Sequence, residues 1–531
     1  MGNHQIFPLA NGQGFRYNRG MSNGPSAAAL RWQLTPRRLL SVLLPLSLFV
    51  LAAQPQTDPD LWWHLRTGQW ILENREIPHS DPFSFTMLGA HWVAHEWLAD
   101  VGLYLLYQAG GLTALSIVTA QLVTATFMSV YFRSAMRPHI AVFTTLLAAL
   151  AAAAAWGPRP AMLTMLFSAV TLTALRRARL NSRWLWSLPA LFVLWANVHS
   201  GFFFGLVIVG ATLAGESVEQ YLARRGFANG DTALAPSPIG ERPLPIRTLA
   251  AALVLSTAAS ALNPNGLELL AYPFFTLTSK AMQSYIAEWH SPDFHELHFL
   301  PLAALLMLLL LSFAISKRRP PAAELILLLG LSYESLVSLR NIPLFAIVAA
   351  PVLAGQCAAL IVAARNQTAR AADSAPATGP VPVPRMMLIL NWVLLVLFAL
   401  VALLRVVSVF AGPDPVAKEF PVQAANYLMS TKSAGPLLNS YNFGGYLIWR
   451  LYPTYPVFID GRADVYGDAF MDEYYARMWQ GYGDWREYLN RFKIRLVLME
   501  KGGTLASLLR SEPGWQIVHE DDVAAVFQRV P

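Results

Sequence analysis

The sequence predicts a polytopic α-helical membrane protein with a small α/β domain at its C-terminal end. Hydrophobic residues make up 55% of the 531-residue chain. Charged residues make up only 13%, about half of their share in a typical soluble domain, and the mean hydropathy is +0.40. Apolar runs recur as far as Phe410, and a polar composition returns from Gly412 onwards.

The apolar runs predict about eleven transmembrane helices. Several are shorter than the roughly 20 residues that a helix needs to cross a bilayer, so neighbouring residues or protein must shield their ends. The runs are 39–53, 112–132, 140–156, 161–175, 184–198, 202–213, 249–262, 299–315, 325–339, 344–364 and 386–410. A twelfth run, 98–109, contains Asp100 and ends at Gly110-Gly111. We expect it to be re-entrant or interfacial, because runs of this length rarely span.

The arginines predict the orientation of these helices. Arg31, Arg37 and Arg38 precede the first run, and cytoplasmic loops carry an excess of Lys and Arg. A cytoplasmic N-terminus, with 98–109 left out of the count, places the Arg-rich connections inside and the C-terminal domain outside. The inside loops 223–247 and 365–384 are rich in Pro, Ala and Gly and are expected to be linkers.

These signals divide the chain into three parts. Residues 1–37 are expected to form a flexible cytoplasmic tail, and residues 38–411 a transmembrane domain with a long first external loop, 54–111. Residues 412–531 are expected to form a soluble extracytoplasmic α/β domain, because short helices alternate with strands. The expected helices there are 421–430, 445–451, 485–492 and 505–510, and the expected strands are 436–440, 456–460, 495–499, 515–520 and 523–529.

The charge and cysteine content exclude two classes of site. The formal net charge is +7, but the basic residues lie between apolar runs and set topology, so no nucleic-acid partner is expected. Cys357 is the single cysteine, which excludes a disulfide or a Cys-based metal site within one chain.

The start of the first external loop is the most informative stretch of the chain. Asp58, Asp60, His64 and Arg66 directly follow the first apolar run. Ionisable groups at a membrane edge indicate function, because charge is costly in hydrocarbon. The alternative is an interfacial loop whose tryptophans lie at headgroup level. Apolar spacing predicts that 60–74 is an amphipathic helix along the membrane surface, whose N-terminus would favour an ionised Asp58.

Other external connections each contribute one polar group that could bind a donor or substrate. These groups are Arg159, His199, Glu288 and Arg340, and His64 of the first external loop is a further candidate for this role. Carboxylates and arginines at one membrane face suit a reaction on a lipid-linked phosphate: a carboxylate takes a proton from the acceptor hydroxyl, and arginine neutralises the departing phosphate. Alternatively, the arginines snorkel to headgroups, and His199 is an ordinary histidine at a helix end.

Two further patterns have a chemical and a structural interpretation. His91, His95 and Glu96 are spaced so that they could hold a divalent metal on a helix, although such a cluster is more often an ordinary polar face. Asp460-Gly-Arg462-Ala-Asp464 could bind a polar ligand or could end the strand 457–459. Asp-Gly after a strand is a common turn signal, which favours the structural role.

These motifs, in this order and on this side of the membrane, resemble the GT-C superfamily of integral-membrane glycosyltransferases, in a bacterial branch usually left uncharacterised. The resemblance runs from about residue 40 to the C-terminus. Its motifs are Asp58-Pro-Asp60-Leu-Trp-Trp-His64-Leu-Arg66-Thr-Gly, Asp81-Pro-Phe-Ser, His95-Glu96-Trp-Leu, Trp195-Ala-Asn-Val-His199, Asn263-Pro-Asn-Gly, Glu288-Trp289, Leu339-Arg340-Asn-Ile, Gly444-Gly-Tyr-Leu-Ile-Trp and Phe458-Ile-Asp460-Gly-Arg462. The Trp-Trp-Asp-Tyr-Gly motif of oligosaccharyltransferases is absent, so protein N-glycosylation is not implied.

The resemblance implies a glycosyltransferase that uses a polyprenyl-phosphate-linked sugar at the outer face of a prokaryotic cytoplasmic membrane. Asp58 or Asp60 would be the catalytic base, and the acceptor would be a glycan, a lipid or a protein. No cofactor is required besides the lipid-linked co-substrate, although a divalent metal could take part. The alternatives are a transporter or flippase of a lipid-linked glycan, or a non-catalytic membrane scaffold. A transporter predicts inverted repeats and ionisable groups near the midplane of the spans.

Overall fold

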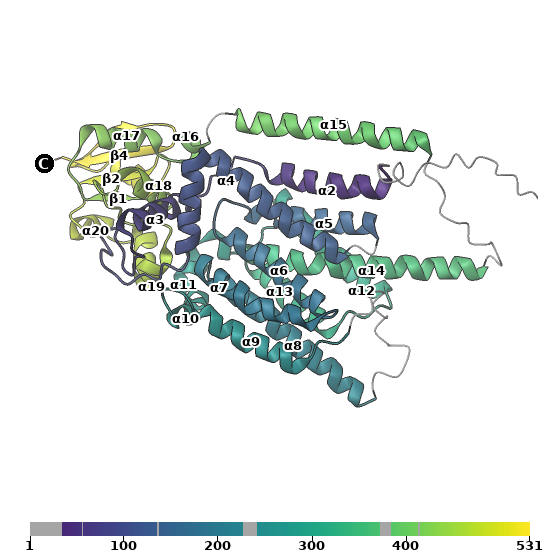
Figure 1. Ribbon diagram of the computed structural model, residues 1–531. Coiled ribbons are helices and arrows are strands. Elements are labelled where there is room, and N and C mark those ends of the chain that lie inside the picture. Colours follow the sequence, from purple (N-terminus) through teal and green to yellow (C-terminus); the bar gives the residue numbers. More distant parts are fainter. Residues whose placement is uncertain are drawn as a thin grey trace, which may run out of the picture.

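The computed structural model describes residues 34–55, 57–134, 137–226, 242–371, 384–412 and 415–530. Nearly all of the expected tail, 1–37, and the central parts of the two expected linkers lie outside these residues. The described chain forms a bundle of long helices with a smaller domain at one end of it (Figure 1).

Each of the eleven apolar runs coincides with a helix of the bundle. Pro36 and the Thr35 side chain, which accepts a hydrogen bond from the Arg38 amide, begin the first of these helices. The bundle consists of α2 (Pro36–Ala52), α4 (Trp97–Ser134), α5 (Pro138–Ala152), α6 (Ala161–Ala178), α7 (Leu188–Val198), α8 (Phe202–Arg224), α9 (Ile246–Ser260), α12 (Leu300–Ile315), α13 (Ala322–Val337), α14 (Ile342–Ala371) and α15 (Arg385–Phe410), with short 3-10 turns η1 (Ala153–Ala155) and η2 (Ser182–Ser187).

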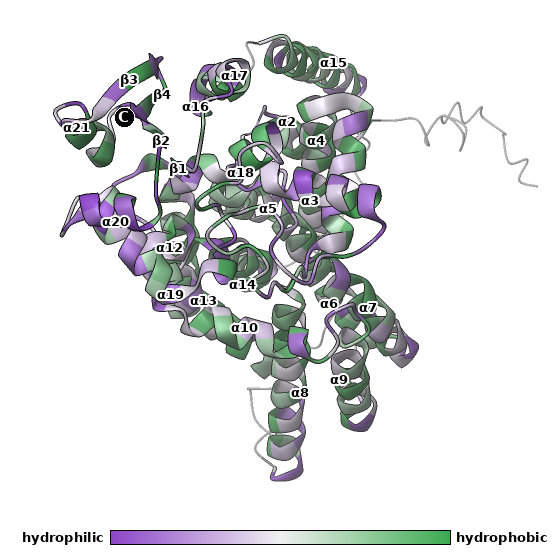
Figure 2. Cartoon of the chain, turned by 90° about the vertical axis from the view of Figure 1, so that its left-hand side faces the viewer, coloured by the Kyte–Doolittle hydropathy of each residue, from purple (hydrophilic) through white to green (hydrophobic). Residues whose placement is uncertain are grey.

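Six helical stretches within the described residues are long and apolar enough to cross a membrane. They are Trp97–Ser134, Pro138–Ala155, Phe202–Arg224, Leu297–Ile315, Leu339–Arg365 and Arg385–Phe410. Green, hydrophobic residues predominate on α8, α9 and α15, and purple, hydrophilic residues gather on α20 and near α3 (Figure 2). The protein is therefore a multi-pass membrane protein whose bundle exposes many large apolar side chains.

The run 98–109 forms the first part of α4, which contains a sharp break. Gly110 and Gly111 have non-helical backbone angles, and Gly111 has a φ of 59°, a conformation that glycine adopts without steric cost. The break separates a short polar-ended helix, which carries Asp100, from the long apolar helix that follows.

The first external loop contributes α3 (Leu61–Asn74), as its spacing predicts. The helix contacts α4 and α18 (Tyr441–Leu451), and Trp62, Trp63 and Leu65 are buried. The first two turns of α3 are thus buried against protein, because apolar side chains extend over more than one of its faces. Its last residues, 72–74, are exposed.

The C-terminal domain is built on a four-stranded sheet. Its order is β1-β2-β4-β3, with β1 (Leu437–Asn439) parallel to β2 (Leu496–Glu500) and the pairs β2–β4 and β3–β4 antiparallel. The expected terminal hairpin is confirmed as β3 (Trp515–Glu520) and β4 (Ala524–Arg529). The helices are α16 (Val416–Glu419), α17 (Val422–Thr431), α18, α19 (Ala463–Tyr474), a π-helix (Tyr475–Trp479), α20 (Trp485–Arg491) and α21 (Thr504–Leu509).

The expected strand at 456–460 is wrong. Val457 forms only an isolated bridge with Ser84 of the first external loop, and Thr86 Oγ1 donates to the Phe458 carbonyl. This apolar segment is buried under the first loop instead of joining the sheet. Short apolar runs do not distinguish a strand from other buried backbone.

Two hydrophobic cores hold the molecule together. One lies among the bundle helices, and the other joins the C-terminal domain to the first external loop through Leu61, Trp62, Phe83 and Trp92. The second core also contains Met282, from the segment between α9 and α12. This segment comprises α10 (Glu268–Thr278), α11 (Lys280–Tyr285), η3 (Ala287–Trp289) and η4 (Leu297–Phe299). Three parts distant in sequence thus meet at one end of the bundle.

Candidate active site

A cavity of about 670 Å³ lies where the bundle meets the C-terminal domain. It brings together most of the candidate residues, which come from connections far apart in sequence. Of the candidates, Asp58, Asp60, His64, His95, Glu96, Arg159, His199, Glu288 and Arg340 line it, and His91 does not. The external connections that were expected to lie on one side of the membrane therefore converge on one space.

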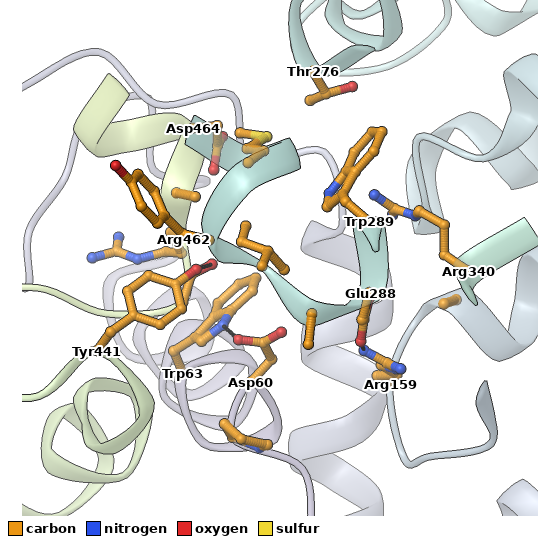
Figure 3. Close-up of a pocket in the computed structure, with 18 of the residues that line it drawn as sticks. Asp60, Trp63, Arg159, Thr276, Glu288, Trp289, Arg340, Tyr441, Arg462 and Asp464 are labelled. Atoms are coloured by element: carbon orange, nitrogen blue, oxygen red, sulfur yellow. Dashed lines mark hydrogen bonds and ion pairs between the residues drawn. The ribbon is translucent and has the colours of Figure 1, made fainter. Parts of the chain in front are cut away.

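Arg159 lies between the carboxylates of Asp58 and Glu288. Its Nε lies 3.3 Å from Asp58 Oδ2, and its Nη1 pairs with Glu288 Oε1 (Figure 3). Burial alone would raise the pKa of Glu288, but the Arg159 guanidinium holds that pKa below its usual value. Burial alone would lower the pKa of Arg159, and the carboxylates of Asp58 and Glu288 raise it. The guanidinium fills the space that a divalent cation bridging these two carboxylates would need.

The loop before α6 positions Arg159. The Arg159 amide donates to the Gly157 carbonyl over 2.9 Å. A β-carbon at Gly157 would lie 3.1 Å from Asp58 Oδ2, which is tighter than most real contacts. The glycine therefore allows the loop to approach Asp58 closely, and the two prolines that flank Arg159 limit its backbone freedom.

Asp60 has a different environment from Asp58, although both precede α3. Its Oδ1 accepts a hydrogen bond of 3.1 Å from Trp63 Nε1, and Gly461 of the C-terminal domain lies against the same oxygen. Burial, together with the charges of Asp58 and Glu288, raises the pKa of Asp60 to about 8, against the opposing effect of Arg159. Asp58 lies closer to the guanidinium and accepts the Asp60 amide at 2.9 Å. The geometry therefore favours Asp60 over Asp58 as the group that exchanges a proton.

Glu96 lies among three histidines. Its carboxylate oxygens lie 3.3 Å from His199 Nε2, 3.7 Å from His95 Nε2 and 3.8 Å from His64 Nδ1. His64 Nδ1 also lies 2.6 Å from Asp100 Oδ1. Burial lowers the pKa of each imidazole, that of His95 to about 4, and raises the pKa of Glu96 to about 8. This wall of the cavity can offer hydrogen bonds to hydroxyl groups without adding much net charge.

His199 is both a histidine that makes hydrogen bonds at a helix end and a residue that lines the cavity. Its Nδ1 accepts the Gly201 amide at 2.8 Å and lies 2.9 Å from Thr164 Oγ1. Because Nδ1 accepts from a backbone N–H, the proton of the neutral ring lies on Nε2, which faces Glu96. The helix-end contacts thus fix the tautomer that this residue presents to the cavity.

Arg340 is the cavity cation whose charge is least neutralised by direct contacts. Its guanidinium lies 4.6 Å from the centre of the Trp289 ring, and no carboxylate among the described residues forms an ion pair with it. Figure 3 shows Arg340 beside Trp289, on the opposite side of Glu288 from Asp60. A stacked guanidinium without an acidic partner is suited to binding an anion such as a phosphate.

The structure does not bring the proposed metal ligands together. His91 lies outside the cavity, where its Nε2 is 2.6 Å from Oε1 of Glu268, and both side chains are exposed. His95 and Glu96 face the cavity instead. Across the described residues, no group of three or more His, Cys, Asp or Glu side chains has an arrangement that could hold a metal ion. The sequence spacing misled because this segment is not a regular helix before Trp97.

Arg462 is part of the framework of the site. Its Nη2 lies 2.7 Å from Asp460 Oδ2 and 2.8 Å from Asp81 Oδ1, and its guanidinium lies 4.6 Å from the centre of the Trp92 ring. This buried ion pair ties the first external loop to the C-terminal domain. Within the same motif, Asp464 lines the cavity.

Sequence reasoning missed several cavity residues because they belong to elements without a distinctive motif. Aromatic side chains are the largest group among them. The missed residues include Trp92, Asp100, Tyr272, Tyr285, Trp289, Tyr441, Tyr475 and Trp479. Among these residues, Trp289 had one signal in the sequence, because it belongs to the Glu288-Trp289 motif.

Comparison with known proteins identifies the fold. No family model matches the chain, and no curated protein matches it. The archaeal oligosaccharyltransferase AglB from Archaeoglobus fulgidus, solved with an inhibitory peptide and a dolichol-phosphate, is 14% identical with a TM-score of 0.50, covering 87% of this chain and 69% of its own. The protein has the GT-C fold.

A second solved GT-C structure is ArnT from Cupriavidus metallidurans bound to undecaprenyl phosphate. It is 17% identical, with a TM-score of 0.46, and the match covers 92% of this chain and 97% of ArnT. The likeness to AglB confirms the GT-C fold that the sequence resembles and the fold class expected from it. The GT-C fold consists here of the helical bundle together with the small C-terminal sheet domain.

Proposed function

We propose that this GT-C protein is a glycosyltransferase that moves a sugar from a polyprenyl-phosphate donor to an acceptor at the outer face of a cytoplasmic membrane. The observation that carries the proposal is Asp60, a half-buried carboxylate that lines the same cavity as Arg159 and Arg340 and whose pKa is raised to about 8. A proton acceptor and a phosphate-binding cation in one space are what transfer from a lipid phosphate requires.

Asp60 is the proposed general base. An acceptor hydroxyl attacks the anomeric carbon of the sugar, the bond from that carbon to the phosphate oxygen breaks, and the hydroxyl proton passes to the Asp60 carboxylate. The pKa of Asp60, about 8, makes the ionised form a stronger base than an ordinary aspartate. Its hydrogen bond from Trp63 fixes the direction of the carboxylate.

Arg340 is the proposed partner of the departing lipid phosphate. Its guanidinium lies on the Trp289 ring without an acidic partner among the described residues, so it can bind the charged phosphate of the donor both before and during its departure. Arg159 has a different role, because its guanidinium already forms ion pairs with Asp58 and Glu288. It holds the two carboxylates together and lowers the negative charge that the donor phosphate would meet.

His64, Glu96 and His199 are proposed to bind the sugar. They offer hydrogen-bond donors and acceptors along one wall, and burial favours the neutral forms of these side chains at neutral pH. A glycan, a lipid or a protein that presents a hydroxyl could serve as the acceptor.

The decisive experiment measures sugar transfer from a labelled polyprenyl-phosphate sugar by the purified full-length protein in lipid nanodiscs. Asp60→Asn keeps the shape of the side chain and removes the base, so transfer should fall roughly 10²- to 10⁴-fold. Asp58→Asn is the matched control and should cost less, because Glu288 still holds Arg159. If both variants keep full activity, the transferase mechanism is refuted.

A further inference from the structure

Three aspartates of α19 contact the external segment that carries Glu288. Asp468 binds the start of α11 through hydrogen bonds, Asp464 interacts with Tyr272 of α10, and Asp472 interacts with Tyr285 at the end of α11. Asp468 and Asp472 are four residues apart in the continuous part of α19 and therefore lie on one side of it. The backbone break at Gly467, with a φ of 72°, separates Asp464 from the other two.

Asp468 makes the most complete of these contacts. Its Oδ1 accepts from the Ser279 hydroxyl at 2.5 Å and from the Ala281 amide at 3.4 Å, and its Oδ2 accepts from the Lys280 amide at 2.9 Å. These are the first amides of α11, which have no partner inside that helix. The Ser279 hydrogen bond is the main reason that the pKa of Asp468 lies below its usual value.

The end of α11 is held in the same way. The ring of Tyr285 stacks on the ring of Tyr475 from the π-helix that continues α19, with the ring centres 4.2 Å apart and the planes 2° from parallel. Met282, between these two anchors, lies in the core of the C-terminal domain. The segment is thus fixed at both ends of α11 by residues of that domain.

The other side of the same segment is fixed to the bundle. Ser338 Oγ donates to the Glu288 carbonyl over 2.8 Å, and the Leu339 amide donates to the His290 carbonyl over 3.1 Å. Glu288 therefore lies directly between one anchor on the C-terminal domain and another next to Arg340. A shift of α11 would move Glu288 relative to Arg159.

We propose that Asp464, Asp468 and Asp472 are positioning residues through which the C-terminal domain holds residues 268–290 over the cavity and keeps Glu288 on Arg159. The role of the C-terminal domain is then to complete the site and not only to bind an acceptor. The positional part holds for any reaction in the cavity, and its consequence for sugar transfer rests on the proposed function.

Limited trypsin digestion of the full-length protein tests the positional part without any substrate. Lys280 is exposed, and its amide is one of the three groups that donate a hydrogen bond to Asp468. Asp468→Ala removes three accepted hydrogen bonds, so cleavage after Lys280 should become roughly fivefold faster or more, as expected for the loss of a helix cap that controls local opening. Asp468→Asn keeps an oxygen acceptor and should stay within about twofold of the wild-type rate.

Glu473→Ala is the matched control. Glu473 is on the same helix but pairs with Arg477 and Arg491 and not with the segment. Its cleavage after Lys280 should equal that of the wild type. Cleavage after the exposed Arg486 of α20 reports general unfolding of the domain, and its rate should not change in any of these variants.

Two results would overturn the proposal. One is wild-type cleavage after Lys280 in Asp468→Ala. The other concerns the case in which Asp468→Ala speeds cleavage after Lys280 and after Arg486 alike, as general unfolding would. Tyr285→Phe keeps the ring stack and removes the hydroxyl that Asp472 contacts. The proposal is then overturned if Tyr285→Phe does not speed cleavage after Lys280 alone. If instead the proposed function is wrong, neither the wild type nor any variant transfers sugar. The rates of cleavage after Lys280 then still differ among the variants as described above.

Transfer assays add a readout that a purely structural role would not change. Displacement of Glu288 from Arg159 should lower kcat of Asp468→Ala about tenfold, and the Asp468→Asn variant should restore most of it. An Asp468→Ala variant that is cleaved faster but transfers sugar at the wild-type rate would show that the position of residues 268–290 does not affect catalysis.

Discussion

Gly461 of the C-terminal domain lies against the carboxylate of Asp60, so closely that a β-carbon at position 461 would overlap Asp60 Oδ1. Gly461 of the C-terminal domain thus limits the positions that the carboxylate of Asp60, the proposed base, can adopt. A glycine is required here by space and not by backbone angle, because no positive φ is recorded for it.

Gly461→Ala should therefore lower transfer roughly 10²-fold, since a displacement of about 1 Å at a reacting group has that effect. The measurement is kcat on a labelled lipid-phosphate sugar. Gly502→Ala is the control, because a β-carbon there meets nothing within 4 Å, and it should be neutral. A normal kcat in the Gly461→Ala variant would show that Asp60 tolerates displacement and is not the base.

The pH dependence of kcat/KM should report Asp60. A base works in its ionised form, and the pKa of Asp60 lies at about 8, so kcat/KM should rise as pH increases from about 6 and level off above about 9. Glu96 titrates in the same range, so the two variants Asp60→Asn and Glu96→Gln separate them. The rise should persist in Glu96→Gln and disappear in the residual activity of Asp60→Asn; the reverse pattern would make Glu96 the base.

Chelation should leave transfer unchanged, because the guanidinium of Arg159 already occupies the space between Asp58 and Glu288. The assay compares rates with EDTA and with added Mg²⁺ or Mn²⁺. Arg159→Lys should lose roughly tenfold to a hundredfold, since a single ammonium does not match two carboxylates as a planar fork does. Complete inhibition of the wild type by EDTA, reversed by a divalent cation, would contradict this prediction.

Arg340→Ala should weaken donor binding more than it slows the chemical step at saturation. Loss of a hydrogen bond to a charged group costs about 1.5–3 kcal/mol, which corresponds to a rise of roughly tenfold to a hundredfold in KM for the donor. Arg450→Ala, which removes an exposed arginine that binds Asn426 outside this cavity, should change neither constant. A normal KM in Arg340→Ala would place the donor phosphate elsewhere.

The predicted orientation can be measured with single cysteines in a Cys357→Ser background. Ser182 lies in η2, next to Arg183, and Ser430 lies on α17 of the C-terminal domain; both are exposed. A membrane-impermeant maleimide added to intact cells should label Ser430→Cys and not Ser182→Cys. Labelling of position 182 from outside would reverse the topology.

Hydropathy predicted the bundle well because it is a local property of the chain. Each apolar run coincides with a helix, and the cavity gathers the polar groups of the external connections, from Asp58 to Arg340. The strand expected at 456–460 failed because its partner, Ser84, lies far away in sequence. The break of α4 coincides with the Gly110-Gly111 pair that ended the run 98–109.

Individual roles within the site depended on distances that spacing does not contain. His91 and His95 are four residues apart, yet they face different surroundings. Asp58 and Asp60 are chemically equal in sequence, and only the structure distinguishes them, through the closer approach of Arg159 to Asp58 and the contacts of Asp60 with Trp63 and Gly461. The contacts of α19 with the segment before Glu288 could not be expected, because the sequence did not predict that helix.

The glycine pair at positions 110–111 also has a mechanical consequence. It connects the wall of the cavity, which carries Glu96 and Asp100, to a membrane-crossing helix that must adapt to the thickness of its bilayer. Hydrophobic mismatch is relieved largely by tilting, and a rigid helix would transmit that tilt to the wall. A joint at the interface absorbs it, so the arrangement of reacting groups can stay constant in bilayers of different thickness.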